Sequence, residues 1–171
     1  MSTRISIIGL LIMLSVTATW AQNSPKELGT MVFKAFQSQK LGALDRHVPQ
    51  PDQAIKIANA LGINRTKEET AIFKEKYPSE VRQFKNRCDD ILERGSARGI
   101  NWSAITLEKV EIVEKVVHVS ETEPDKTITS TYVDIIFNSK DRKFRIELTT
   151  VFELDGIWYL GGDRIEIEEI N

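Results

Sequence analysis

The sequence predicts an α+β fold in which N-terminal helices pack on a bent, cone-like, four-stranded antiparallel sheet. Before Gly99, apolar residues recur at three- and four-residue intervals, as on the buried side of helices. After Gly99, β-branched residues dominate and apolar positions alternate, as in strands with one buried face. The pair Asp155-Gly156 separates two such runs and predicts a tight hairpin.

The N-terminus, residues 1–21, has the pattern of a secretory signal peptide. Arg4 precedes an apolar run over 5–16, and Thr19 and Ala21 stand at the −3 and −1 positions of a cleavage site. The run holds about a dozen residues, whereas a membrane-spanning helix needs roughly 20, which disfavours an uncleaved anchor. We therefore expect residues 22–171 to form a single periplasmic or secreted domain with no membrane span.

The charge, the cysteine count and the histidine positions argue against a nucleic-acid-binding protein, a disulfide-stabilised fold and a metalloprotein. The formal net charge is −2, with lysines and arginines scattered between acids, so no basic patch for nucleic acid is expected. Cys88 is the only cysteine and cannot form a disulfide within the chain. His47 and His118 lie far apart without paired cysteines, so the sequence predicts neither a metal site nor a cofactor.

Capping motifs mark the first two expected helices. Ser24, Pro25 and Glu27 form a capping box with proline at the first helical position. A second helix is expected to be capped by Asp52 and stopped by Gly62. The apolar stripe of the first helix comprises Leu28, Val32, Phe36, Leu41 and Leu44.

The third helical segment begins with a second capping box, formed by Thr66 and Glu69. Pro78 either kinks one long helix or starts a new one. The stripe after the proline comprises Val81, Phe84, Cys88 and Ile91. Because Cys88 falls on this stripe, we expect a buried thiol.

Four strands are expected, over 104–119, 127–137, 144–154 and 157–170. The first strand changes the face of its apolar residues, which predicts a β-bulge near Glu108 or Lys109. Gly161 and Gly162 predict a bulge or a sharp bend in the last strand. The third strand alternates with one inward face, comprising Phe144, Ile146, Leu148, Thr150 and Phe152.

Two neighbouring aromatic residues stand in the last strand. Because adjacent strand residues face opposite sides, Trp158 and Tyr159 are expected to separate. We expect Trp158, with Leu160, to pack in the core. Tyr159, with Ile157, is then expected on the open face or at the rim of the cone.

Three segments carry a resemblance to a known superfamily: 80–95 (EVRQFKNRCDDILERG), 99–111 (GINWSAITLEKVE) and 142–165 (RKFRIELTTVFELDGIWYLGGDRI). In apolar spacing and aromatic hairpin they resemble the nuclear-transport-factor-like α+β cone superfamily, and more narrowly small secreted Bacteroidetes proteins of unknown function. The resemblance implies a cone whose mouth can hold a ligand. It includes no catalytic signature, and the superfamily hosts enzymes, binders and scaffolds alike.

Several side chains are candidates for a site. Trp102, Tyr132, Trp158 and Tyr159 are aromatic residues that could form a binding wall for a ligand or a partner. Asp134 shares a strand face with Tyr132, and a ketosteroid-isomerase-like cone uses such an acid as base and such a phenol as donor. Cys88 paired with a histidine is a weaker alternative, because no nucleophile signature flanks it.

Taken together, the sequence favours an exported, non-enzymatic binding module for a small apolar ligand or a protein partner. One alternative is an isomerase or hydro-lyase of the same fold that uses Asp134 and Tyr132. Another is a structural dimerisation module that forms a homodimer. An acid inside an open pocket favours the enzyme, whereas a filled cone with an exposed aromatic face favours the binder or the dimer.

Overall fold

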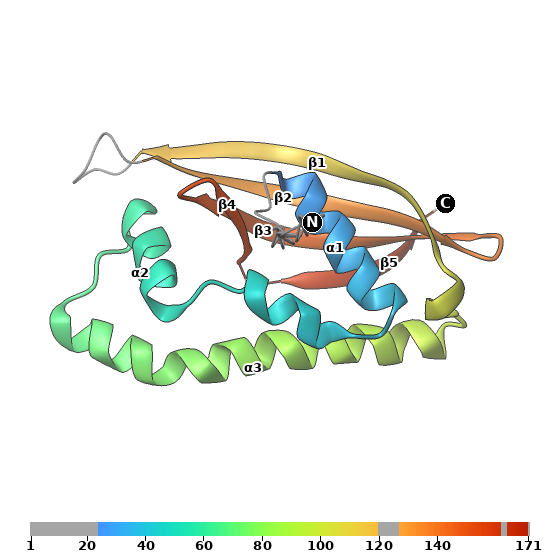
Figure 1. Cartoon of the computed structure of the whole chain (residues 1–171), viewed down its shortest axis with the longest axis horizontal. Helices are drawn as coiled ribbons and strands as arrows, with labels where there is room; N and C mark the ends of the chain where they lie inside the picture. Colours follow the sequence, from blue (N-terminus) through green and yellow to red (C-terminus); the bar gives the residue numbers. More distant parts are fainter. Residues whose placement is uncertain (1–23, 120–126, 162–163, 171) are drawn as a thin grey trace, which may run out of the picture.

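The computed structural model describes residues 24–119, 127–161 and 164–170; the expected signal peptide lies outside these ranges. The elements are α1 (Pro25–Gln37), η1 (Leu41–His47), α2 (Pro51–Ala60), α3 (Lys67–Ala97), η2 (Trp102–Ala104), β1 (Thr106–Val119), β2 (Thr127–Ser139), β3 (Arg142–Leu154), β4 (Ile157–Leu160) and β5 (Ile165–Ile170). The α+β class and the order of helices before strands are as predicted. In Figure 1, α3 runs below the sheet along the length of the strands, with α1 in front.

The sheet is antiparallel throughout, with the order β1-β2-β3, and both β4 and β5 pair with β3. β4 pairs with residues 151–154 of β3, and β5 pairs with residues 143–148. The prediction of one final strand over 157–170 is therefore wrong: β4 ends at Leu160, and β5 begins at Ile165. At this point the amide of Gly161 donates to the carbonyl oxygen of Thr150 at 2.9 Å, and a Cβ on Gly161 would lie 2.8 Å from that oxygen, so the position requires glycine.

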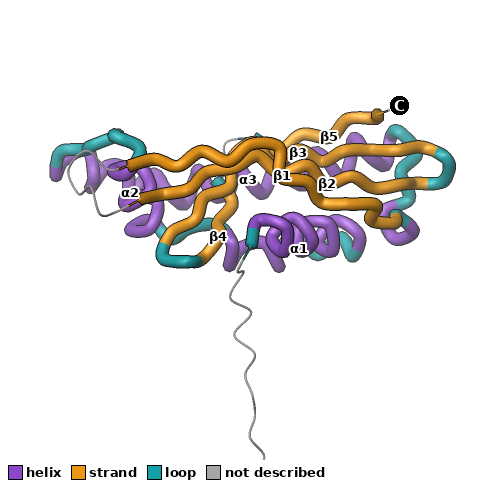
Figure 2. Tube along the Cα trace, turned by 90° about the horizontal axis from the view of Figure 1, so that it is seen from above, coloured by secondary structure: helices purple, strands orange, loops and turns teal. Residues whose placement is uncertain are grey.

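Register shifts bend the long strands. The predicted bulge near Glu108 is confirmed by a shift between Leu107 and Lys109, and a second shift lies between Ile112 and Glu114. A third, unpredicted shift lies between Thr131 and Val133 of β2, which pair with Val151 and Leu148 of β3. Figure 2 shows the strands as one layer, with the β3–β4 hairpin turned away from the rest.

The third shift changes which residues of β3 face the core. Leu148 and Val151 both belong to the main core, although they are three residues apart. Phe152 consequently points to the opposite side of the sheet from Val151. The prediction that Phe152 continues the inward face of Phe144 is therefore wrong, because the extra residue reverses the alternation.

The main core lies between α1, α3 and one face of the sheet. Its members include Leu28, Val32 and Phe36 of α1, Phe84, Cys88 and Ile91 of α3, and Ile135, Phe137, Phe144 and Ile146 of the sheet. These side chains are 4% exposed or less. They occupy the concave side, where the cone hypothesis places a ligand.

Helix caps and Pro78 define the helical layer. Ser24 caps α1 as predicted, accepting from the amide of Glu27 at 3.2 Å. α2 is capped by Gln50 rather than by Asp52, because Pro51 is the first helical residue and Asp52 lies in the first turn. Pro78 lies inside α3, which is one helix of 31 residues, so the alternative of a new helix at Pro78 is excluded.

Candidate ligand-binding cavity

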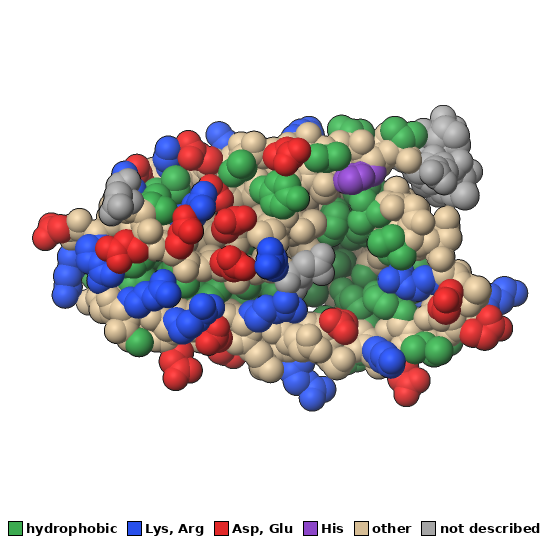
Figure 3. All heavy atoms as spheres, turned by 180° about the vertical axis from the view of Figure 1, so that it is seen from behind, with side chains coloured by type: hydrophobic (Ala, Val, Ile, Leu, Met, Phe, Trp, Pro, Cys, Tyr) green, Lys and Arg blue, Asp and Glu red, His purple; other side chains and the backbone are tan. Residues whose placement is uncertain are grey.

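A cavity of about 340 Å³ lies between α2, α3 and the end of the β3–β4 hairpin. Figure 3 shows it as a hollow with apolar side chains, between the sheet and the long helix. Its volume is at the lower end of the range of small-molecule sites, about 300–1,000 Å³. It is lined by Val48, Pro49, Ala54, Ile57, Ala58, Leu61, Ile63, Arg65, Phe73, Lys76, Tyr77, Glu80, Val81, Phe84, Arg87, Phe152, Leu160 and Gly161.

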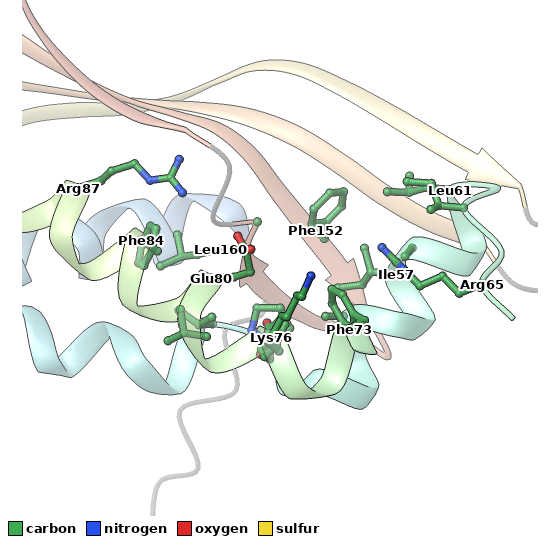
Figure 4. Close-up of a pocket in the computed structure, with 18 residues that line it drawn as sticks. Ile57, Leu61, Arg65, Phe73, Lys76, Glu80, Phe84, Arg87, Phe152 and Leu160 are labelled. Atoms are coloured by element: carbon green, nitrogen blue, oxygen red, sulfur yellow. The ribbon is translucent and has the colours of Figure 1, made fainter. Parts of the chain in front are cut away.

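The reversed alternation of β3 builds the sheet side of this cavity. Phe152, turned away from the main core, packs with Ile128 against Ile57 and Ala60 of α2. This second apolar cluster holds α2 against the sheet, while α3 continues beneath it (Figure 4). The space left between the two helices and Phe152 is the cavity.

A buried hydroxyl fixes the wall formed by the segment before α2. Tyr77 of α3 donates its hydroxyl to the carbonyl oxygen of Pro49 at 2.5 Å. Burial raises the pKa of Tyr77 to about 12, which extends the pH range in which this hydroxyl can donate. The bond ties the α2 N-terminus to α3, which keeps the cavity walls in place.

Charged side chains border the apolar interior. Among the described lining residues, three are basic, Arg65, Lys76 and Arg87, and one is acidic, Glu80. Figure 4 shows Arg65 and Arg87 directed inwards from opposite ends, with Phe152 between them. Lys76 and Glu80 are exposed, whereas the two arginines are half-buried. The cavity therefore combines apolar walls with an excess of positive charge.

Trp102, expected to form part of a binding wall, lies in the core. It is 3% exposed, and its ring packs against Phe36 and Phe137 at centroid distances of 5.5 and 5.9 Å. Its Nε1 donates to the carbonyl oxygen of Leu92 at 2.9 Å. Trp102 thus joins the end of α3 to the sheet, and it does not line the cavity.

The two aromatic residues of β4 are both buried. Trp158 is 4% exposed and belongs to the main core, as predicted. The prediction that Tyr159 stays on an open face is wrong, since Tyr159 is only 6% exposed. The reason is α2, which reaches this side of the sheet and whose Gln53 donates from Nε2 to the hydroxyl of Tyr159 at 2.8 Å.

Asp134 and Tyr132 lie on the face of the sheet turned away from the main core. Asp134 is 6% exposed and accepts a bond from Nη1 of Arg145 at 2.9 Å. Arg145 also reaches Glu168 at 2.5 Å, so Asp134 belongs to a charge network. Tyr132 is 40% exposed, and neither residue lines the cavity. The catalytic role of this pair stays a prediction.

Cys88, His47 and His118, the remaining candidates for a nucleophile or a metal ligand, do not line the cavity. Cys88 is 1% exposed and burial raises its pKa to about 12, which confirms the predicted core thiol. His47 is buried and accepts from Nε of Arg46 at 3.0 Å, while His118 bonds Ser130 at 2.8 Å. The described residues contain no group of three or more His, Cys, Asp or Glu placed to hold a metal ion.

The residues that line the cavity were not predicted as a site. Arg65, Phe73 and Phe152 stand on a loop, a helix and a strand, and each has an ordinary local pattern. The cue closest to them was the capping box beginning at Thr66, which places Arg65 just before a helix. It gives no sign that the guanidinium turns back towards a cavity.

Comparison with protein-family models, with curated proteins and with solved structures gives no match for this chain. The resemblance to the nuclear-transport-factor-like superfamily accordingly stays an expectation beyond the α+β class. Over 24–119, 127–161 and 164–170, none of the helices has the length and apolar character that crossing a membrane requires.

Proposed function

We propose that the protein is an exported binding module that takes up a small molecule with an apolar body between α2, α3 and β3. The observation that carries the proposal is the cavity itself, about 340 Å³ in volume and walled by side chains such as Ile57, Phe73 and Phe152. Its export rests on the signal-peptide pattern of residues 1–21. Water in a hollow with such walls is displaced favourably by an apolar ligand.

A binding role is supported further by where the reactive groups lie. The cavity is lined by neither Cys88 nor Asp134, the two groups with the strongest claim to chemistry in the sequence. Of its described lining residues, the acidic one is the exposed Glu80. These positions favour uptake and release of a ligand over its conversion.

The proposal is tested with a neutral apolar dye, N-phenylnaphthylamine, whose fluorescence rises in apolar surroundings. The wild-type protein is expected to bind it saturably. Ala58→Phe places a ring in the cavity from α2 and should weaken binding roughly tenfold or more, because it fills the volume the dye needs.

The matched control is Ala71→Phe, an exposed position on α3 outside the cavity, which should leave dye binding unchanged. Circular dichroism of both variants checks that they fold. Absence of saturable dye binding to the wild type, or equal weakening by both variants, would overturn the proposal.

Dimerisation stays a second prediction. Within the described part of the chain, β1 pairs only with β2, and it exposes Val113, Val117 and Val119. The bulges at both ends of 107–114 interrupt the regular edge that strand addition would need. The small-molecule site is therefore the function that the geometry supports best.

A further inference from the structure

We propose that the ligand is an amphipathic carboxylate, with its apolar chain beside Phe152 and its headgroup on Arg65. This inference rests on the proposed function and names the chemistry of the ligand. Three observations carry it: a hydrogen-bond donor of Arg65 that has no partner, the stacking of its guanidinium on Phe73, and the distribution of charge around the cavity.

Arg65 has an unsatisfied donor. Its Nη1 atom is buried and finds no hydrogen-bond partner among the described residues. A buried N–H group without a partner is costly, and the cost is larger for a charged group. Arg65 lines the cavity, so a small rotation of its guanidinium would bring this donor, which is closed to solvent in the free protein, onto an acceptor of a bound ligand.

The guanidinium of Arg65 is held by an aromatic ring. Its central carbon lies 4.4 Å from the ring centroid of Phe73. Such stacking uses the face of the guanidinium and leaves its N–H edge available. Figure 4 shows this edge turned back over Phe73 towards Ile57 and the cavity. A planar donor edge fixed in this way matches the two oxygens of a carboxylate.

The charge around the cavity is uneven. In Figure 4, Lys76 points into the space near Phe73 and Phe152, whereas Glu80 lies nearer Leu160. The end that holds Arg65 therefore carries two cations and no acid among the described lining residues, whereas Arg87 shares the opposite end with Glu80. An anion is favoured at that end, with the apolar chain extending over Phe152 towards Phe84.

The test compares two ligands that differ in the headgroup alone, decanoate and decanol, as competitors of bound N-phenylnaphthylamine at about pH 8, where the acid is ionised. Decanoate should displace the dye from the wild type at a roughly tenfold lower concentration than decanol. Arg65→Gln should remove most of that preference and leave the affinity for decanol within about twofold.

The matched control is Arg82→Gln, which removes a charge from an exposed position of α3 outside the cavity and should keep the preference. A further measurement needs only the wild type: the preference for decanoate over decanol should shrink as ionic strength rises, because salt screens the attraction between the carboxylate and Arg65. If decanol binds as well as decanoate, or the preference survives Arg65→Gln, this inference fails while the proposed function stands. If no probe binds, the proposed function itself fails.

Discussion

The buried imidazole of His47 is expected to make stability depend on pH. Burial, with the nearby charge of Arg46, lowers its pKa from 6.5 to about 4. His47 is thus neutral in the fold, and the unfolded chain takes up a proton first as the pH falls. The free energy of unfolding should decrease between about pH 6.5 and pH 4, by up to about 3 kcal/mol from this group.

His47→Gln removes the titrating group, so the pH dependence of this variant should be shallower than that of the wild type. Urea unfolding at about pH 7 and about pH 4 measures the difference, and other titrating groups cancel in the comparison. An identical loss of stability in both proteins would contradict the role given to His47.

Tyr159 and Trp158 are expected to matter to stability alike. Trp158→Ala should cost about 3–5 kcal/mol, as for a buried large aromatic side chain. Tyr159→Ala should cost about 3 kcal/mol, because it opens a cavity under α2 and leaves Gln53 without its acceptor. Denaturant unfolding checks both. A loss below about 1 kcal/mol for Tyr159→Ala would show that α2 does not cover this side.

At the scale of elements, Gly95 sets the distance between α3 and η2. A Cβ there would lie 2.3 Å from Cζ2 of Trp102, whose ring is enclosed by Phe36 and Phe137. Gly95→Ala should therefore destabilise the protein by about 1–2 kcal/mol, the clash outweighing the better helix propensity of alanine.

The control is Gly42→Ala, since a Cβ at Gly42 would meet nothing within 4 Å. It should be neutral or slightly stabilising, through a less flexible unfolded chain. Thermal unfolding of the two variants decides the point, and equal melting temperatures would rule out the contact with Trp102 as the constraint.

The elements that rest on local chemistry were predicted from the sequence. The Ser24 cap, the Thr66 capping box and the first bulge of β1 all follow from a few neighbouring residues. The third register shift was not predicted. The extra residue lies at Thr149 or Thr150, and a threonine is compatible with either face of a strand, so the sequence 144–154 fits a regular strand and a bulged strand equally well. That single shift turns Val151 into the main core and Phe152 into the second apolar cluster, the opposite of what regular alternation predicts.

At the scale of the whole molecule, the candidate site arises from elements far apart in the chain. Arg65, Phe73 and Phe152 come together only because α2 packs against both α3 and the end of the β3–β4 hairpin. The sequence predicted that helices cover one concave side, so it placed any ligand in the cone. The proposed function keeps the kind of ligand that the sequence predicted, a small molecule with an apolar body. It moves the binding site from the cone to the cavity between α2, α3 and β3.

The most direct test of the central claim is a crystal structure of the protein grown with decanoate. The account predicts density for the chain alongside Phe152 and Ile57, with the carboxylate within hydrogen-bonding distance of Arg65. An empty cavity at a saturating concentration of decanoate, or decanoate bound only outside the α2–α3 space, would contradict it.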